Sequence, residues 1–161
     1  MSQPALFLDR DGVLNVDHGY VSRIEDFDPV PGVFAALRQA ATNGYALVVV
    51  TNQSGIGRGY FSQADYDALE AQIISLFASN GVELTAVYHC PHRPDANCEC
   101  RKPLPGMILR AAREHTLDLA GSMMIGDKPS DIAAGQAAGV GRTALITPQR
   151  TIVDIIDQLK I

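Results

Sequence analysis

Short apolar runs alternate with helix-like segments along the whole chain. The apolar runs have the length of strands and cover residues 5–8, 45–50, 82–89, 122–125 and 143–147. Segments in which apolar residues recur at helical spacing cover residues 32–43, 62–80, 106–115, 129–138 and 152–159. The strands are apolar throughout rather than alternating, which is typical of strands buried on both faces of a parallel sheet. The pattern therefore predicts an α/β fold with an open, mainly parallel, Rossmann-like sheet and helices on both of its faces.

Local signals mark the start of several helices. Ser62 and Asp65 have the spacing of a capping box, and Pro129 suits the first turn of a helix. Residues 16–27 carry several charges without a clear period, and we interpret them as a loop or short flap beside Asp11. The sequence contains no repeat or linker, and 161 residues correspond to about one domain, so residues 1–161 are expected to form a single domain.

Polar and charged residues follow the ends of the predicted strands. These residues are Asp9 and Asp11, Thr51 and Asn52, Arg101 and Lys102, and Asp127 and Asp131. Functional groups of open α/β sheets lie just beyond the carboxyl ends of the strands, so the sequence predicts that these side chains meet there.

The carboxylates and the donors in this set suit different parts of one reaction. Carboxylates of Asp9, Asp11 and Asp127 offer the hard oxygen ligands that Mg²⁺ prefers. The Thr51 hydroxyl and the Lys102 ammonium suit phosphate oxygens. A magnesium ion, a phosphate cradle and a spare carboxylate together predict phosphoryl transfer. Taken singly, each residue also has an explanation without function. Asp-x-Asp-Gly is common in turns, and most lysines such as Lys102 lie solvated at the surface.

The cysteines form a second candidate site. Cys90, His92, Cys98 and Cys100 supply three thiols and an imidazole, the Cys₃His set of closed, structural zinc sites. The alternative is a chance grouping of buried cysteines. Because Cys100 directly precedes Arg101 and Lys102, a zinc ion here would order both cations without taking part in the chemistry.

Composition narrows the function further. The net charge of −5 argues against binding nucleic acid non-specifically, and the apolar runs are far too short to span a membrane. The absence of a signal peptide and the clustering of all three cysteines favour the cytoplasm over an oxidising compartment. No stretch is long enough for a large cap domain, which favours a small polar substrate with a second anionic group. We also expect a monomer.

The motifs resemble a known superfamily. Asp9-x-Asp11-Gly12, Thr51-Asn52, Lys102 and Asp127-x-x-x-Asp131 resemble, in this order, the four motifs of the haloacid dehalogenase (HAD) superfamily of phosphatases, and the resemblance extends to about Thr147. More narrowly, four segments resemble the D-glycero-D-manno-heptose 1,7-bisphosphate 7-phosphatases, which act in the synthesis of nucleotide-activated heptose for lipopolysaccharide. These segments are Asp17-His18-Gly19-Tyr20, Thr51-Asn52-Gln53-Ser54-Gly55, the Cys-x-Cys-Arg-Lys-Pro end of the cysteine segment, and Gly126-Asp127-Lys128.

The resemblance implies a role for each catalytic position. Asp9 is implied as the nucleophile that becomes an aspartyl phosphate, and Asp11 as the general acid and base. Magnesium is implied to bind Asp9, the backbone carbonyl of Asp11, and Asp127. Thr51 and Lys102 would hold the phosphoryl oxygens, and Asp131 would orient Lys102 or a metal-bound water.

The substrate is expected to be a phosphorylated sugar held by loops. The predicted binding residues are Asp17, His18, Gly19, Tyr20, Thr51, Asn52, Gln53, Ser54, Arg101, Lys102 and Lys128, with Arg58 as a further cation.

Two alternatives stay open at this point. The short gap between His92 and Cys98 resembles histidinol-phosphate phosphatases, which would change the substrate but not the reaction. A receiver-like signalling domain also gathers aspartates, a threonine and a lysine above a parallel sheet, but it needs neither the zinc segment nor Asp11 as an acid and base.

Overall fold

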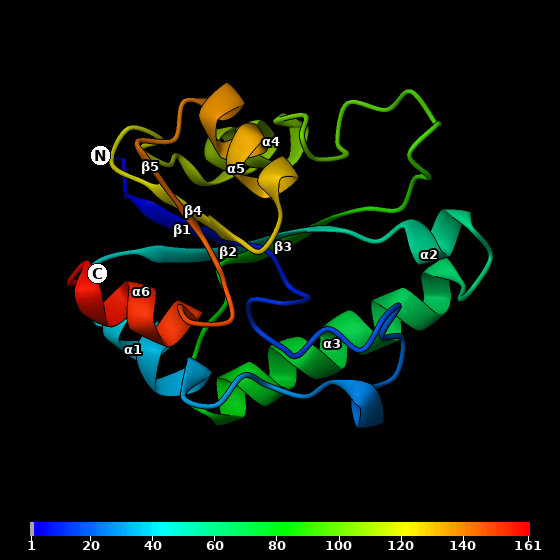
Figure 1. Cartoon of the computed structure of the whole chain (residues 1–161), viewed down its shortest axis with the longest axis horizontal. Helices are drawn as coiled ribbons and strands as arrows, with labels where there is room; N and C mark the ends of the chain where they lie inside the picture. Colours follow the sequence, from blue (N-terminus) through cyan, green and yellow to red (C-terminus); the bar gives the residue numbers. More distant parts are fainter. Residues whose placement is uncertain (1) are drawn as a thin grey trace.

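The computed structural model describes residues 2–161 and contains a five-stranded sheet (Figure 1). The strands are β1 (Ala5–Leu8), β2 (Ala46–Asn52), β3 (Ala86–Cys90), β4 (Met123–Gly126) and β5 (Arg142–Leu145). All paired strands are parallel, in the order β3-β2-β1-β4-β5, which confirms the predicted sheet. The chain order reverses at β1, so that β4 returns to pair with it. Ligands of open α/β sheets bind at such a switch point.

Helices cover both faces of the sheet, as Figure 1 shows. α1 (Val33–Thr42), α3 (Gln63–Ser79) and α6 (Ile152–Gln158) lie on one face. α4 (Gly106–His115) and α5 (Pro129–Ala138) lie on the other. Within residues 2–161, the loops between these elements form no large cap domain.

The central strand shows why the sheet needs both layers. Leu6 and Leu8 contact the core on the α1, α3 and α6 side, whereas Ala5 and Phe7 contact the core on the α4 and α5 side. Successive side chains of a strand point to opposite faces, so a run of four apolar residues is buried only when both faces are covered. The continuous apolar pattern of β1 thus follows from its place in the middle of the sheet.

The structure corrects the predicted elements in three places. β3 begins at Ala86 rather than at residue 82, because the backbone N–H of Val82 still bonds the carbonyl of Phe77 and closes the end of α3. A short helix, α2 (Ser54–Gly57), occupies part of the glycine-rich loop after β2. A 3₁₀ turn, η1 (Ile24–Asp26), lies within the segment interpreted as a flap. In residues 2–161, no helix has the length and apolar character needed to cross a membrane.

Candidate active site

Two adjoining cavities lie beyond the carboxyl ends of the strands. The larger has a volume of about 340 Å³, and its lining comprises Asp11, Asp17, Gly19, Tyr20, Asn52, Gln53, Ser54, Gly55, Arg101, Lys128 and Ser130. The smaller, of about 40 Å³, is lined by Asp9, Asp11, Asn52, Lys102, Lys128, Ser130 and Asp131. Because Asp11, Asn52, Lys128 and Ser130 line both, the small polar cavity forms the inner end of the large one.

Lys102 connects the acidic residues at the inner end. Its buried ammonium contacts Asp9 Oδ1 at 2.9 Å, Asp131 Oδ1 at 2.5 Å and the carbonyl of Val50 at 2.8 Å, so all three of its hydrogens have acceptors. Burial alone would lower the pKa of Lys102, but the carboxylates of Asp9 and Asp131 outweigh burial and raise it. Lys102 therefore remains a cation beside Asp9.

Asp127 and Asp9 have the properties of ligands for a divalent cation. One oxygen each from Asp9, Asp127 and Asp131 lies within 4.8 Å of the others. Asp127 Oδ1 is buried and accepts no hydrogen bond within residues 2–161. Burial and the neighbouring charge of Asp9 raise the pKa of Asp127 to about 7, so negative charge at this point is poorly compensated. Magnesium fits such a set of hard oxygen donors.

Asp131 differs from the other two carboxylates because both of its oxygens have protein partners. Oδ1 contacts Lys102, and Oδ2 accepts a hydrogen bond from the backbone N–H of Lys128. This arrangement is compatible with the predicted orienting role.

The carboxylate of Asp11 is held by donors other than Lys102. Arg10 donates to both of its oxygens at 3.1 Å, Asn15 donates to Oδ1 at 3.0 Å and Gln53 donates to Oδ2 at 3.1 Å. The chain turns back at Gly12, whose φ of +87° suits glycine and where a Cβ atom would overlap Asp127. A side chain at position 12 would therefore push the loop that carries Asp9 and Asp11 away from β4.

Asn52 and Thr51 form hydrogen bonds with neighbouring residues of the site, and Thr51 lies outside the sets that line the two cavities. The Asn52 amide exchanges two hydrogen bonds with the backbone of Lys102, at 3.1 and 3.2 Å. Thr51 is buried, and its hydroxyl oxygen accepts a hydrogen bond from Gln53 at 2.9 Å. An occupied acceptor leaves the Thr51 hydrogen available for donation.

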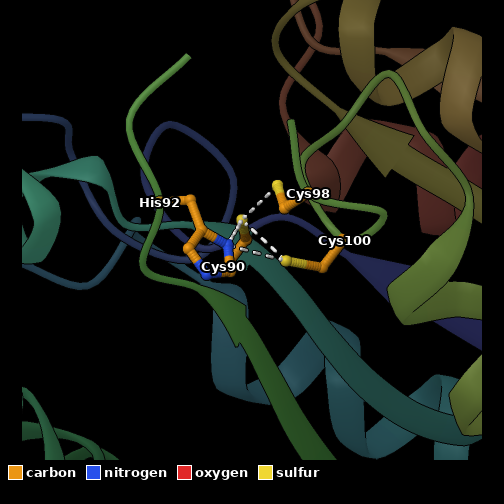
Figure 2. Close-up of side chains that lie close together, drawn as sticks. All are labelled: Cys90, His92, Cys98 and Cys100. Atoms are coloured by element: carbon orange, nitrogen blue, oxygen red, sulfur yellow. Dashed lines mark hydrogen bonds between the residues drawn. The ribbon is translucent and has the colours of Figure 1, made fainter. Parts of the chain in front are cut away.

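The four predicted zinc ligands lie close together, as Figure 2 shows. The sulfur of Cys90 lies 2.9 Å from that of Cys100 and 3.7 Å from that of Cys98. His92 Nδ1 lies 3.4 Å from Cys90 Sγ and 3.3 Å from Cys100 Sγ. Zn–S bonds of about 2.3 Å separate the sulfurs of a tetrahedral site by about 3.8 Å, so a small opening of this cluster accommodates zinc. The donors thus fit a closed metal site.

The structure brings most of the predicted substrate-binding residues to the large cavity. Two of its cations are Arg101 and Lys128, and Arg101 Nη1 is buried without a hydrogen-bond partner in residues 2–161. His18 instead lies at the surface, 3.3 Å from Asp28, and Arg58 donates to the Ser54 hydroxyl. Both of these side chains lie outside the set that lines the cavity.

Three polar residues of the site escaped the sequence prediction. Arg10 and Asn15 are buried beside Asp11, and Ser130 lines both cavities. Arg10 and Asn15 stand within the opening motif, and a charged residue between two aspartates is a usable signal. Ser130 gives no such signal, because serine is common in the first turn of a helix.

The fold and the site define a HAD-like phosphatase. The profile of a family described as HAD-hydrolase-like matches residues 99–151. The D,D-heptose 1,7-bisphosphate phosphatase of B. bronchiseptica, solved with magnesium and phosphate, is 31% identical, with a TM-score of 0.83 and 98% of each chain covered.

Curated relatives narrow this class. A D-glycero-beta-D-manno-heptose-1,7-bisphosphate 7-phosphatase of Yersinia pestis is 48% identical over 90% of this chain and 81% of its own. One of the same name from Helicobacter pylori (strain ATCC 700392 / 26695) is 50% identical over 88% and 83%. The chain belongs to the family of D-glycero-beta-D-manno-heptose-1,7-bisphosphate 7-phosphatases.

Proposed function

We propose that this protein is a magnesium-dependent phosphatase that removes the 7-phosphate of D-glycero-D-manno-heptose 1,7-bisphosphate. The observation that carries this proposal is the pairing of the buried Asp9, Lys102 and Asp131 cluster with a neighbouring cavity that contains two further cations. Relatives of about half identical sequence, named for this activity, support the choice of substrate.

Asp9 acts as the nucleophile in this proposal. Its carboxylate lies at the inner end of the cavity beside the Lys102 ammonium, which attracts the phosphoryl oxygens to the same point. Attack on phosphorus forms an aspartyl phosphate and releases the sugar oxygen. The Thr51 hydroxyl, with its acceptor already used by Gln53, donates to a phosphoryl oxygen.

Asp11 acts as the acid and then as the base. It lines both cavities, so it lies between the inner end and the open space that holds the sugar. It gives a proton to the leaving oxygen, and afterwards it removes a proton from the water that hydrolyses the aspartyl phosphate. The positions of the two carboxylates separate their roles, because Lys102 contacts Asp9 at the inner end and Asp11 also lines the open cavity.

Asp9, Asp127 and the backbone carbonyl of Asp11 would hold the magnesium ion. When bound, it supplies positive charge that reduces the repulsion between the Asp9 carboxylate and the phosphate. Asp131 keeps Lys102 in place from the other side.

The second phosphate of the substrate binds Arg101, with Lys128 nearby. Arg101 lines the cavity and has a buried N–H group with no acceptor among residues 2–161, and its planar fork matches phosphate oxygens. Cys90, His92, Cys98 and Cys100 would hold a zinc ion, and this would order the backbone on which Arg101 lies. Reduced thiols of this kind suit the cytoplasm.

A phosphate-release assay with three substrates tests the proposal. We expect heptose 1,7-bisphosphate to have a higher kcat/KM than histidinol phosphate or a heptose monophosphate. Arg101→Ala should lower kcat/KM for the bisphosphate by a factor that corresponds to about 1.5 to 3 kcal/mol, the usual contribution of a charged hydrogen bond. The same change should lower kcat/KM for the monophosphate much less.

Arg93→Ala is the matched control, because Arg93 lies in the same segment but is exposed and paired with Asp95. Preference for histidinol phosphate, or an equal loss on all substrates in Arg101→Ala, would contradict the assignment.

A further inference from the structure

We propose that Arg10 is a positioning residue for the proton transfers of Asp11, an inference that rests on the proposed function. Arg10 donates through Nε and Nη2 to Oδ1 of Asp11 and through Nη2 to Oδ2, each at 3.1 Å. Neighbouring side chains in a strand point to opposite faces, but β1 ends at Leu8 and the chain bends at Arg10. The bend allows the guanidinium to turn back onto the next residue.

Arg10 approaches Asp11 from the side opposite to the substrate. The large cavity is lined by Asp11 and Gln53, whereas Arg10 lines a separate, small space of about 10 Å³ with Tyr66 and Glu70. Its side chain is only 3% exposed. Arg10 therefore acts through Asp11 rather than by touching the substrate.

The contacts of Arg10 differ in strength from the other contacts of Asp11. A carboxylate has about four lone-pair sites, and Asp11 receives donors from Arg10, Asn15 and Gln53. Hydrogen bonds from a charged group are roughly twice as strong as those from neutral amides. When Asp11 exchanges a protein contact for a substrate or water proton, the Gln53 amide on the cavity side yields first. The Arg10 fork stays and fixes the plane of the carboxylate.

Arg10 also fixes the two loops that border the cavity. Its Nη2 atom donates to the carbonyl of Val21, next to the loop of Asp17 and Tyr20, at 3.2 Å and to Gln53 Oε1 at 3.4 Å. The orientation of Asp11 is thereby coupled to the loop after β2 and to the predicted flap. A lysine has no fork and reaches only part of this set.

Two substrates with different leaving groups distinguish a positioning effect on Asp11 from a general loss of activity. A sugar oxygen needs a proton as it leaves, whereas p-nitrophenolate leaves without one. The aspartyl phosphate formed from either substrate still needs Asp11 as a base. We expect Arg10→Met to lower kcat on heptose 1,7-bisphosphate by about 100-fold, within the usual range of acid–base catalysis, with KM within threefold of wild type.

With p-nitrophenyl phosphate the same variant should release a burst of p-nitrophenol equal to the enzyme concentration, followed by slow turnover. Arg10→Lys should recover part of the lost kcat. Arg110→Met is the matched control, because Arg110 lies exposed on α4 beside Glu114. Two results would overturn the proposal. One is a burst rate of Arg10→Met that falls, relative to wild type, by the same factor as its steady-state rate; the other is a raised KM with unchanged kcat.

A double-mutant cycle with Asp11→Asn gives an independent test. If Arg10 acts through Asp11, adding Arg10→Met to Asp11→Asn reduces the remaining rate by less than threefold. A further loss similar to that in the wild-type background would overturn the inference. If Arg10→Met does not fold, the cycle uses Arg10→Lys.

The wild-type enzyme separates this inference from the substrate assignment. Turnover of p-nitrophenyl phosphate without turnover of the heptose bisphosphate would reject the proposed function. The burst experiment and the cycle on p-nitrophenyl phosphate would still decide the role of Arg10.

Discussion

At the scale of single residues, the free protein already pairs the proposed nucleophile with the proposed phosphate-binding cation. Asp9 and Lys102 are separated by 2.9 Å and are both almost fully buried. Removing one partner of a buried ion pair is strongly destabilising, because the other charge is then buried without compensation. The site is therefore ordered before substrate arrives.

Asp9→Asn should reduce phosphate release at least about a thousandfold, because it removes the nucleophile and a magnesium ligand together. Asp11→Asn should be nearly inactive as well but should still bind substrate, since its backbone carbonyl is unchanged. Initial rates and substrate binding measure the two effects. Asp157→Asn, an exposed change on α6, is the control; near-normal turnover in Asp9→Asn would sink the mechanism.

Glu70 should make the free energy of unfolding depend on pH. Burial raises the pKa of Glu70 in the folded protein, where it accepts a hydrogen bond from Tyr66 at 2.9 Å. A raised acid pKa favours the protonated form in the fold, so its stabilising contribution is present below the unfolded pKa of 4.5 and is lost as pH rises through the folded pKa.

Glu70→Gln should therefore be more stable than wild type at pH 7, and the difference should shrink as pH falls toward 4. Urea unfolding at a series of pH values measures it. Glu83→Gln serves as a control for general loss of a negative charge. A difference that grows at low pH would contradict the assignment.

At the scale of elements, two sets of contacts fix the position of the segment that carries Arg101 and Lys102. Asn52, the last residue of β2, exchanges hydrogen bonds with the Lys102 backbone. On the other side, Cys98 and Cys100 belong to the cysteine cluster that begins at the end of β3. The two cations are thus anchored to the ends of neighbouring strands.

Cys100→Ser should lower activity through loss of order at Arg101 and Lys102 more than through global unfolding. Metal analysis of the wild type should find about one zinc per chain, which survives dialysis that removes magnesium, as expected of a closed site. Glu99→Gln, an exposed change in the same segment, should keep both zinc and activity. Absence of zinc in protein purified without chelators, or full activity in Cys100→Ser, would refute the structural role.

At the scale of the whole molecule, β1 and β4 bring two carboxylates of like charge to one point. Asp9 follows β1 and Asp127 follows β4, and these strands are paired. Burial and the facing charge of Asp9 together raise the pKa of Asp127. A cation that binds only the folded state should reduce the repulsion between the two carboxylates.

Magnesium should accordingly raise the Tm of the protein. At a concentration 100 times its Kd, a ligand of the folded state stabilises by about 2.7 kcal/mol. Asp127→Asn should lose this response, whereas Asp157→Asn should keep it. Thermal unfolding in MgCl₂ and in NaCl of equal ionic strength measures the effect; an equal shift in Asp127→Asn would show that the ion binds elsewhere.

The sequence by itself determined the five strands, the main helices, the type of sheet and the positions of the reactive residues. Continuous apolar runs such as Val48–Val50 need cover on both faces, and in open α/β sheets the functional groups lie beyond the carboxyl ends of the strands. These are local or pattern-level properties, so they are readable from neighbours along the chain. The same holds for the cysteine cluster, whose members stand within eleven positions, 90 to 100.

Only the tertiary structure decided which polar groups contact one another. The order of the strands and the hydrogen bonds of Asn52 to Lys102 depend on how segments far apart in sequence pack. The contacts of Arg10 with Asp11 and the surface position of His18 depend on how the chain after β1 bends. A sequence specifies which hydrogen-bonding groups exist, but a buried group takes the partner that packing brings within reach.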